Sequence, residues 1–193
     1  EVDDALLEKF LGGEELSMEE MTGGLRRAVL DGKIIPVLAT SALHNIGTGL
    51  LLDAVSAYLP APKERGVSVT GNSGQTETIE PSDTAPLAAL VFKTTADPYV
   101  GKLTYFRVYS GVFESNSQIW NATRGEAERI GQLYLVRGKT QEPVHQVRAG
   151  DIGAVAKLAL TTTGDTLCAR DKPVRLVPMA FPQPTFAEAV YPK

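Results

Sequence analysis

The sequence predicts two bodies of different class, a short α/β segment followed by an all-β domain that forms an antiparallel β-barrel. Apolar residues recur at helical spacing before residue 60 and at alternate positions after residue 87. Residues 61–86 between them are rich in Pro, Gly, Ser, Thr and Glu, which indicates a linker. Charge divides the chain too: residues 1–85 hold 14 acidic and 6 basic residues, and residues 86–193 hold 9 and 13. The basic half is therefore the candidate for binding a polyanion.

The first 60 residues are expected to form two helices, a strand and a third helix. Residues 3–10 carry apolar side chains at helical spacing. Ser17, followed three positions later by Glu20, is typical of the capping box that begins a second helix. Residues 34–39 are apolar on both faces, as expected for a strand of a parallel sheet that helices cover. An amphipathic helix is predicted over residues 49–59.

The barrel is predicted from short alternating segments separated by glycine-containing turns. The seven expected strands are residues 87–93, 102–109, 118–121, 127–135, 142–147, 152–158 and 166–168. The single cysteine, Cys168, lies in the last strand and is interpreted as a small core residue. Because a lone cysteine forms no internal disulfide, the composition fits a reducing, cytoplasmic setting.

Five motifs, in order along the chain, resemble those of a known family. They are LAALVFKT at residues 87–94, DPYVGKL at 97–103, FRVYSG at 106–111, AGDI at 149–152 and TTGDTLC at 162–168. Together they resemble the second domain of elongation factor G, a translational GTPase, or of an elongation-factor-G-like paralogue. Residues 1–60 are similar to the C-terminal part of that family's G domain, and residues 181–193 to the start of its third domain. The resemblance thus implies a translation-factor-type β-barrel over residues 87–180, joined by the linker at 61–86.

The resemblance implies a fragment of a GTP hydrolase that drives movement of transfer RNA and messenger RNA through the ribosome. Its second domain would dock on small-subunit ribosomal RNA, and the remaining G domain and the third domain would be its other partners. The parent would bind GTP and Mg²⁺ and work without a membrane. The phosphate-binding pattern Gly-x-x-x-x-Gly-Lys-Ser/Thr is absent from the sequence. The fragment alone is therefore expected to be inactive, to contain no catalytic residue and to bind neither GTP nor Mg²⁺.

Two sets of residues are candidates for binding. Ser41, Ala42 and Leu43 match the family's last guanine-contacting motif, which implies that the Ala42 N–H donates to the base and that Leu43 packs beside the ring. Candidates for ribosomal RNA contact are the basic residues of the barrel, since Lys and Arg pair with phosphates. These are Lys102, Arg107, Arg124, Arg129, Arg137 and Lys139. The two histidines, His44 and His145, have no Cys or carboxylate at ligand spacing, so no metal site is expected.

Two alternatives remain open. A ribosomal protection protein of the same superfamily, which removes a bound drug, would differ in a fourth domain outside this chain. A stand-alone RNA- or protein-binding β-barrel would bind its partner tightly alone and would have no nucleotide motif upstream. Glu126 and Glu128 lie among the basic residues after Thr123, a departure from the family pattern that fits a divergent paralogue as well as the main factor.

Overall fold

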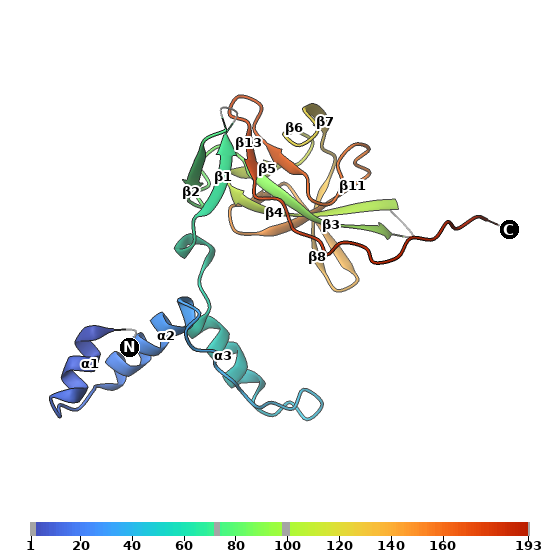
Figure 1. Cartoon of the computed structure of the whole chain (residues 1–193). Coiled ribbons are helices and arrows are strands. Elements are labelled where there is room, and N and C mark those ends of the chain that lie inside the picture. Colours follow the sequence, from blue (N-terminus) through green and yellow to red (C-terminus); the bar gives the residue numbers. More distant parts are fainter. Residues whose placement is uncertain (1–2, 72–73, 98–100, 193) are drawn as a thin grey trace. The chain divides into compact units, whose positions relative to one another are not determined.

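The structure, a computed structural model, describes residues 3–71, 74–97 and 101–192. The chain divides into two compact units, with the boundary between Ala61 and Pro62 (Figure 1). The first unit is helical and the second is an antiparallel β structure. The all-β barrel class predicted for the larger part of the chain is confirmed. No helix in the described ranges is long and apolar enough to cross a membrane.

The helical unit begins with two helices that ion pairs join. Its helices are α1 (Asp4–Leu11), α2 (Met18–Leu30) and α3 (Thr48–Tyr58). The capping box at the start of α2 is formed as predicted, because the Glu20 N–H donates to Ser17 Oγ and the Ser17 N–H donates to the Glu20 carboxylate. Lys9 Nζ on α1 lies 2.8 Å from Glu20 Oε1, and Arg27 on α2 pairs with Asp3, the N-cap of α1. The hydrogen bonds from Lys9 and Ser17 lower the pKa of Glu20 to about 2.

The prediction of a strand over residues 34–39 is wrong. These residues form an irregular connection whose apolar side chains are open to solvent, with Ile35 83% and Val37 92% exposed. A strand requires a neighbour that exchanges backbone hydrogen bonds with it. In the described part of the helical unit, the only pairing of this kind is one isolated bridge between Ser41 and Ile46. The sequence has the apolar pattern of a sheet strand, but these residues have no sheet to join.

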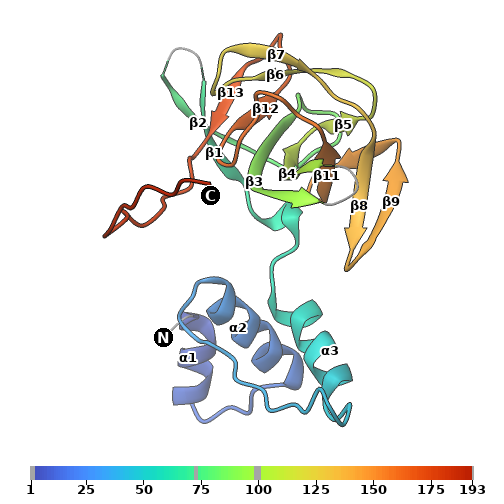
Figure 2. The same cartoon turned by 90° about the vertical axis from the view of Figure 1, so that its right-hand side faces the viewer.

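The second unit is built on one curled eight-stranded sheet. Its strands are β3 (Ala88–Asp97), β4 (Gly101–Ser110), β6 (Gln118–Asn121), β7 (Glu126–Arg129), β8 (Leu133–Arg137), β9 (Thr140–Val144), β11 (Ile152–Ala156) and β12 (Thr166–Cys168). They run in the order β7-β6-β12-β3-β4-β11-β8-β9, all antiparallel (Figure 2). A separate pair, β5 (Val112–Glu114) with β10 (Gln146–Arg148), contributes Phe113 and Val147 to the same core as Phe106 of β4. The strands thereby enclose one apolar interior.

Two of the predicted strands are each divided in two. The segment expected at 127–135 turns at Ile130, whose side chain is buried and whose N–H donates to Ser117 O, so it becomes β7 and β8. The segment expected at 142–147 likewise separates into β9 and β10, which pair with different strands. The apolar spacing at both corners is three residues, from Ile130 to Leu133 and from Val144 to Val147, instead of the two of an alternating strand, a break that the prediction of single strands overlooked.

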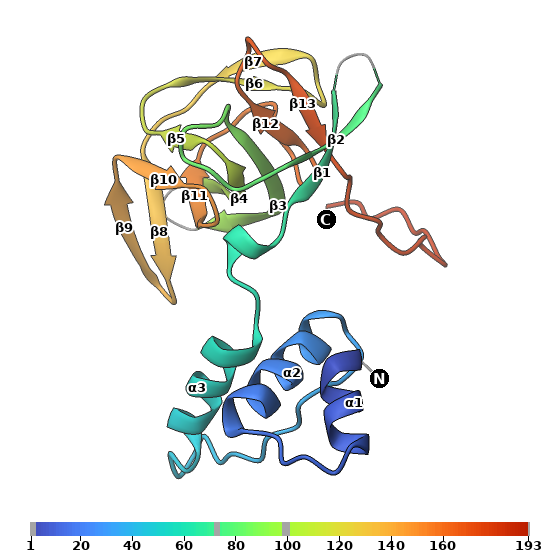
Figure 3. The ribbon, with the colours of Figure 1, turned by 90° about the vertical axis from the view of Figure 1, so that its left-hand side faces the viewer.

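The expected linker at residues 61–86 instead contributes two strands to the second unit. After a short 3-10 helix η1 (Pro62–Glu64), β1 (Val67–Gly71) and β2 (Thr76–Ile79) pair with each other, and β1 also pairs with β13 (Val174–Leu176) (Figure 3). Val69 is fully buried in a second apolar cluster with Leu90 and Cys168. Apolar side chains at alternate positions of β1 therefore outweigh the polar composition around them. Cys168 is a core residue as predicted, and burial raises the pKa of its thiol.

Candidate functional site

The predicted guanine-binding residues lie in a tight turn that leads into α3. Ser41 and Ile46 exchange two backbone hydrogen bonds of 3.0 Å, and the Asn45 N–H donates to Ala42 O at 3.3 Å. Asn45 adopts a left-handed conformation with φ 52°, which Asn accepts more readily than most residues. Thr48 Oγ1 donates to the Asn45 side chain at 2.5 Å and fixes the turn against the first residue of the helix. The turn is therefore held by its own backbone and not by a neighbouring strand.

The centre of this turn presents an unused donor beside an apolar side chain. Within the described residues, no backbone hydrogen bond uses the N–H of Ala42 or of Leu43. The Leu43 side chain is 90% exposed. A backbone N–H and an adjacent leucine can together bind the edge and the face of a planar ring that carries a carbonyl oxygen. The arrangement has the chemistry that a base contact needs.

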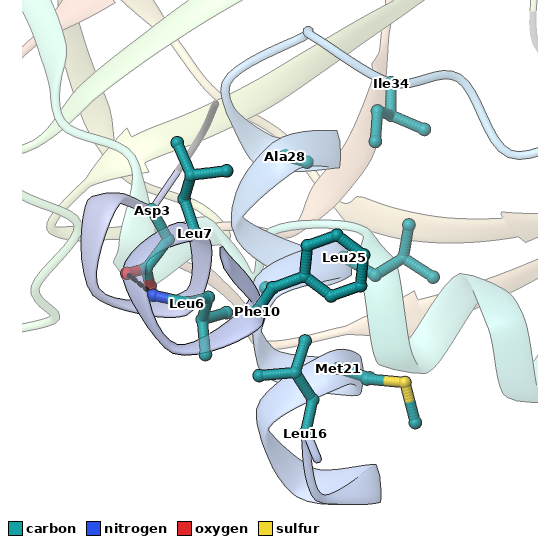
Figure 4. Close-up of a pocket in the computed structure, with 10 residues that line it drawn as sticks. Asp3, Leu6, Leu7, Phe10, Leu16, Met21, Leu25, Ala28 and Ile34 are labelled. Carbon is teal, nitrogen blue, oxygen red and sulfur yellow. Dashed lines mark hydrogen bonds between the residues drawn. The ribbon is translucent and has the colours of Figure 1, made fainter. Parts of the chain in front are cut away.

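The helical unit also carries an open apolar groove between α1 and α2. A cavity of about 380 Å³ is lined almost entirely by apolar side chains, and Figure 4 shows Leu6 and Phe10 of α1 gathered with Met21 and Leu25 of α2 around it. Among the described residues of this unit, only Ala28 is a buried hydrophobic residue. A soluble unit rarely exposes so much apolar surface without a partner. The helical unit therefore exposes more apolar surface than a soluble unit usually does.

This exposed surface predicts a difference in dye binding between two lengths of the chain. The 193-residue chain is expected to enhance the fluorescence of the hydrophobic dye ANS several-fold more than residues 62–193 alone, because the helical unit supplies the accessible apolar side chains. Fluorescence titration of both proteins at equal concentration measures the effect. Equal enhancement would show that the surface of the helical unit is not accessible.

In the second unit, a buried polar network holds the loop between β11 and β12. The Glu128 carboxylate accepts hydrogen bonds from the N–H groups of Leu160 and Thr161, at 2.9 and 3.2 Å, and from Thr161 Oγ1 at 2.5 Å. Asp165 Oδ2 accepts from Asn121 Nδ2 at 3.0 Å and from the Thr162 N–H at 2.9 Å. Both buried carboxylates of this network thus have partners, as burial requires.

The network determines the charge state of Asp165, whose side chain is only 4% exposed. Burial raises the pKa of this carboxyl, but hydrogen bonds from Thr162, Asn121 and Arg124 and the charge of Arg124 outweigh it. The pKa of Asp165 is consequently lowered below its ordinary value of 3.8. The carboxylate is ionised at neutral pH, in the form that accepts all three hydrogen bonds.

Three of the six predicted RNA-contacting residues are engaged within the barrel. Lys102 Nζ donates to Thr161 O at 2.5 Å. Arg124 donates through Nε to Asp165 at 3.2 Å and through a terminal nitrogen to Thr162 Oγ1 at 2.7 Å. Arg107 is half-buried, with its guanidinium 5.2 Å from the centroid of the Tyr109 ring. These side chains contribute to the fold, and the sequence pattern gives no sign of this.

The other three basic residues point to solvent. Arg129, Arg137 and Lys139 are exposed, and Arg137 has one weak ion pair with Glu142 at 3.8 Å. Arg129 lies at the mouth of a polar cavity together with Lys157, a residue that sequence reasoning did not select. No group of three or more His, Cys, Asp or Glu residues that could hold a metal ion occurs in the described ranges.

Comparison with known proteins shows what the barrel is similar to. Residues 86–170 match a family model described as elongation factor G domain 2, and this range includes all strands from β3 to β12. The chain is also similar to a protein from Thermus thermophilus in a crystal structure, with a TM-score of 0.66 and 31% sequence identity. That similarity covers 89% of this chain and 23% of the Thermus protein. The chain thus spans less than a quarter of the length of this relative.

Proposed function

We propose, from the premise that residues 86–170 form a domain 2 of the elongation factor G type, that the chain is part of a translational GTPase. The parent protein hydrolyses GTP and drives the movement of transfer RNA and messenger RNA through the ribosome in the cytoplasm. The family match of the barrel is the observation that carries this proposal. Residues 181–193 then lead into a third domain.

The helical unit supplies the base-binding edge of the GTPase domain in this proposal. The free Ala42 N–H and the exposed Leu43 side chain support contact with guanine. The exposed apolar side chains of residues 34–39 and the groove between α1 and α2 are covered by the remainder of the same protein. GTP phosphates and Mg²⁺ are held by elements outside this chain, so the chain alone has negligible affinity for nucleotide.

The barrel docks on ribosomal RNA of the small subunit through its exposed cations. Arg129, Arg137 and Lys139 are the side chains available for phosphates, whereas Lys102, Arg107 and Arg124 support the barrel itself. Each phosphate that a cation neutralises releases counterions, so affinity falls as salt rises. The excess of basic over acidic residues after residue 86 is consistent with this attraction.

Sedimentation of the 193-residue chain with small ribosomal subunits tests the docking. We expect binding in about 50 mM salt and its loss by about 200 mM salt, because counterion release dominates the affinity. The double variant Arg137→Gln, Lys139→Gln is expected to bind about threefold to tenfold more weakly and with a smaller salt dependence, since two phosphate contacts are removed. Lys33→Gln in the helical unit, which removes one exposed cation outside the barrel, should match the parent chain.

A different outcome would favour one of the alternatives. Binding that is unaffected by salt and by the double variant would show that these cations do not contact RNA. The reading frame upstream of Glu1 gives an independent test, since a phosphate-binding loop and a guanine motif there are required by the GTPase proposal. An upstream region without them, combined with tight binding of the chain to a partner by itself, would identify a stand-alone binding barrel.

A further inference from the structure

A polar cavity of about 460 Å³ opens between the end of β7, the start of β8 and the end of β11. Arg129 and Lys157 line it, together with the side chains of Asn116 and Tyr134. Within the described ranges, neither cation has an ion pair, and no carboxylate lines the cavity. The nearest acidic residue along the chain, Glu128, points inward and is saturated by hydrogen bonds from Leu160 and Thr161. The cavity therefore has a net positive lining that no internal partner neutralises.

The walls of this cavity are fixed by hydrogen bonds. The Asn116 N–H donates to Gly131 O at 3.0 Å, and the Ile130 N–H donates to Ser117 O at 2.9 Å. Gln132 Nε2 donates to Val144 O at 2.8 Å, which ties the start of β8 to the end of β9. Because these bonds hold the backbone on both sides of Arg129, less backbone entropy is lost there when a ligand binds.

Two backbone positions beside the cavity adopt the left-handed conformation that glycine usually provides. They are Asn116, with φ 55°, and Lys157, with φ 62°. Asn accepts this conformation easily, but Lys does not, because its Cβ approaches the following carbonyl. The Lys157 N–H donates to Lys102 O at 2.8 Å, so the pairing of β11 with β4 imposes the conformation. The chain thus places a strained lysine where a glycine would fit, at the edge of a cationic cavity.

We propose that this cavity binds a backbone phosphate of RNA, held between Arg129 and Lys157, with the Tyr134 ring against the adjoining nucleoside. The cavity is larger than a single phosphate and lies within the size range of small-ligand sites. Exposed cations beside an aromatic ring are the combination that recognises unpaired RNA, through ion pairing and stacking. This assignment rests on the proposed docking on ribosomal RNA and names the surface that makes the contact.

Nuclear magnetic resonance of the ¹⁵N-labelled 193-residue chain tests the proposal without ribosomes. A single-stranded oligouridine RNA of about 12 nucleotides is titrated at low salt, and inorganic phosphate is titrated separately. The N–H signals of Asn116, Gly131 and Lys157 are expected to shift first and to saturate with RNA, and to require at least about tenfold more inorganic phosphate. Shifts confined to other surfaces, or inorganic phosphate binding as tightly as RNA, would overturn the proposal.

Two variants separate loss of binding from loss of structure. Arg129→Gln and Lys157→Gly are each expected to weaken RNA binding about fivefold to tenfold, whereas Lys63→Gln, an exposed cation on η1, leaves it unchanged. Lys157→Gly should leave the thermal midpoint unchanged or raise it, since glycine adopts the local backbone without strain. Unchanged RNA affinity in both variants would overturn the assignment.

The same two variants distinguish this inference from the docking that it rests on. If the parent chain sediments with small subunits and both variants do so equally well, the docking stands and the cavity is not the contact. If the parent chain fails to sediment, the docking itself fails, whatever the cavity binds. Weaker sedimentation of both variants, together with saturable RNA shifts at the cavity, supports both.

Discussion

Replacing Asp165 by alanine is expected to lower the free energy of unfolding of the barrel unit by about 3 kcal/mol. One oxygen, Oδ2, accepts three hydrogen bonds, from Asn121 Nδ2, the Thr162 N–H and Arg124 Nε. Asn121 is fully buried, so its amide has no access to water once the acceptor is removed. Trp120, the only tryptophan, lies on β6 of the barrel unit. Urea unfolding monitored by its fluorescence therefore measures the free energy of unfolding of that unit.

Asp165→Asn separates the hydrogen bonds from the charge. The asparagine carbonyl oxygen can take the place of Oδ2 and accept from the same donors, so the expected loss is smaller, about 1 kcal/mol. Asp151→Asn, at an exposed position, is the matched control and should leave stability unchanged. If Asp165→Ala unfolds at the same urea concentration as Asp151→Asn, the network does not stabilise the barrel.

The pH dependence of the same measurement follows from the lowered pKa of Asp165. A carboxyl whose pKa is lower in the folded state contributes stability above its unfolded value, ordinarily 3.8, and this contribution is lost as pH falls through the folded pKa. The difference in stability between the parent chain and Asp165→Asn should therefore be largest at neutral pH and disappear in acid below the folded pKa. A difference that grows on acidification would mean that the pKa is raised.

Structure that depends on neighbouring residues can be predicted from the sequence, whereas structure that depends on distant partners cannot. The capping box of Ser17 and Glu20 and the apolar segments that form β3 and β4 depend on a few neighbouring residues, and both the cap and the two strands are confirmed. The prediction of a strand at residues 34–39 is wrong because a strand needs a hydrogen-bonded neighbour, and the described residues do not contain one. The prediction of a linker at 61–86 missed two strands. The strand β1 has a partner, β13, that lies far along the chain, and composition does not reveal this pairing.

Among the candidate site residues too, local features could be predicted and long-range contacts could not. A cation can be recognised in the sequence, but whether it is free depends on residues far along the chain. Arg124, although its side chain is 48% exposed, contacts Asp165, 41 positions away, whereas Arg129 has no ion pair among the described residues. Lys157 was missed because a left-handed conformation is set by strand pairing, and lysine gives no sign of it. The assignment of Ser41, Ala42 and Leu43 to guanine stays a prediction, which the unused Ala42 N–H supports.

Gly111→Ala is expected to have the second large effect, a loss of at least about 3 kcal/mol in the free energy of unfolding. Gly111 joins β4 to β5 with φ 73°, and its N–H donates to Ser82 O at 2.8 Å. A Cβ added here would lie 2.6 Å from the N and Cα atoms of Leu87 and 2.8 Å from Ala85 O. These are backbone atoms, so relief requires residues 82–87 to move away from the barrel, although they lead directly into β3.

Gly125→Ala is the matched control, because it shares the backbone conformation but not the close approach. Gly125 has φ 72°, and a Cβ there would meet no atom within 4 Å. Its cost is therefore the left-handed conformation alone, about 1 kcal/mol. The difference between the two variants in urea unfolding measures the contact between the β4–β5 turn and the segment before β3. Equal losses of unfolding free energy in the two variants would show that residues 82–87 move away without cost. These residues would then not pack tightly against Gly111.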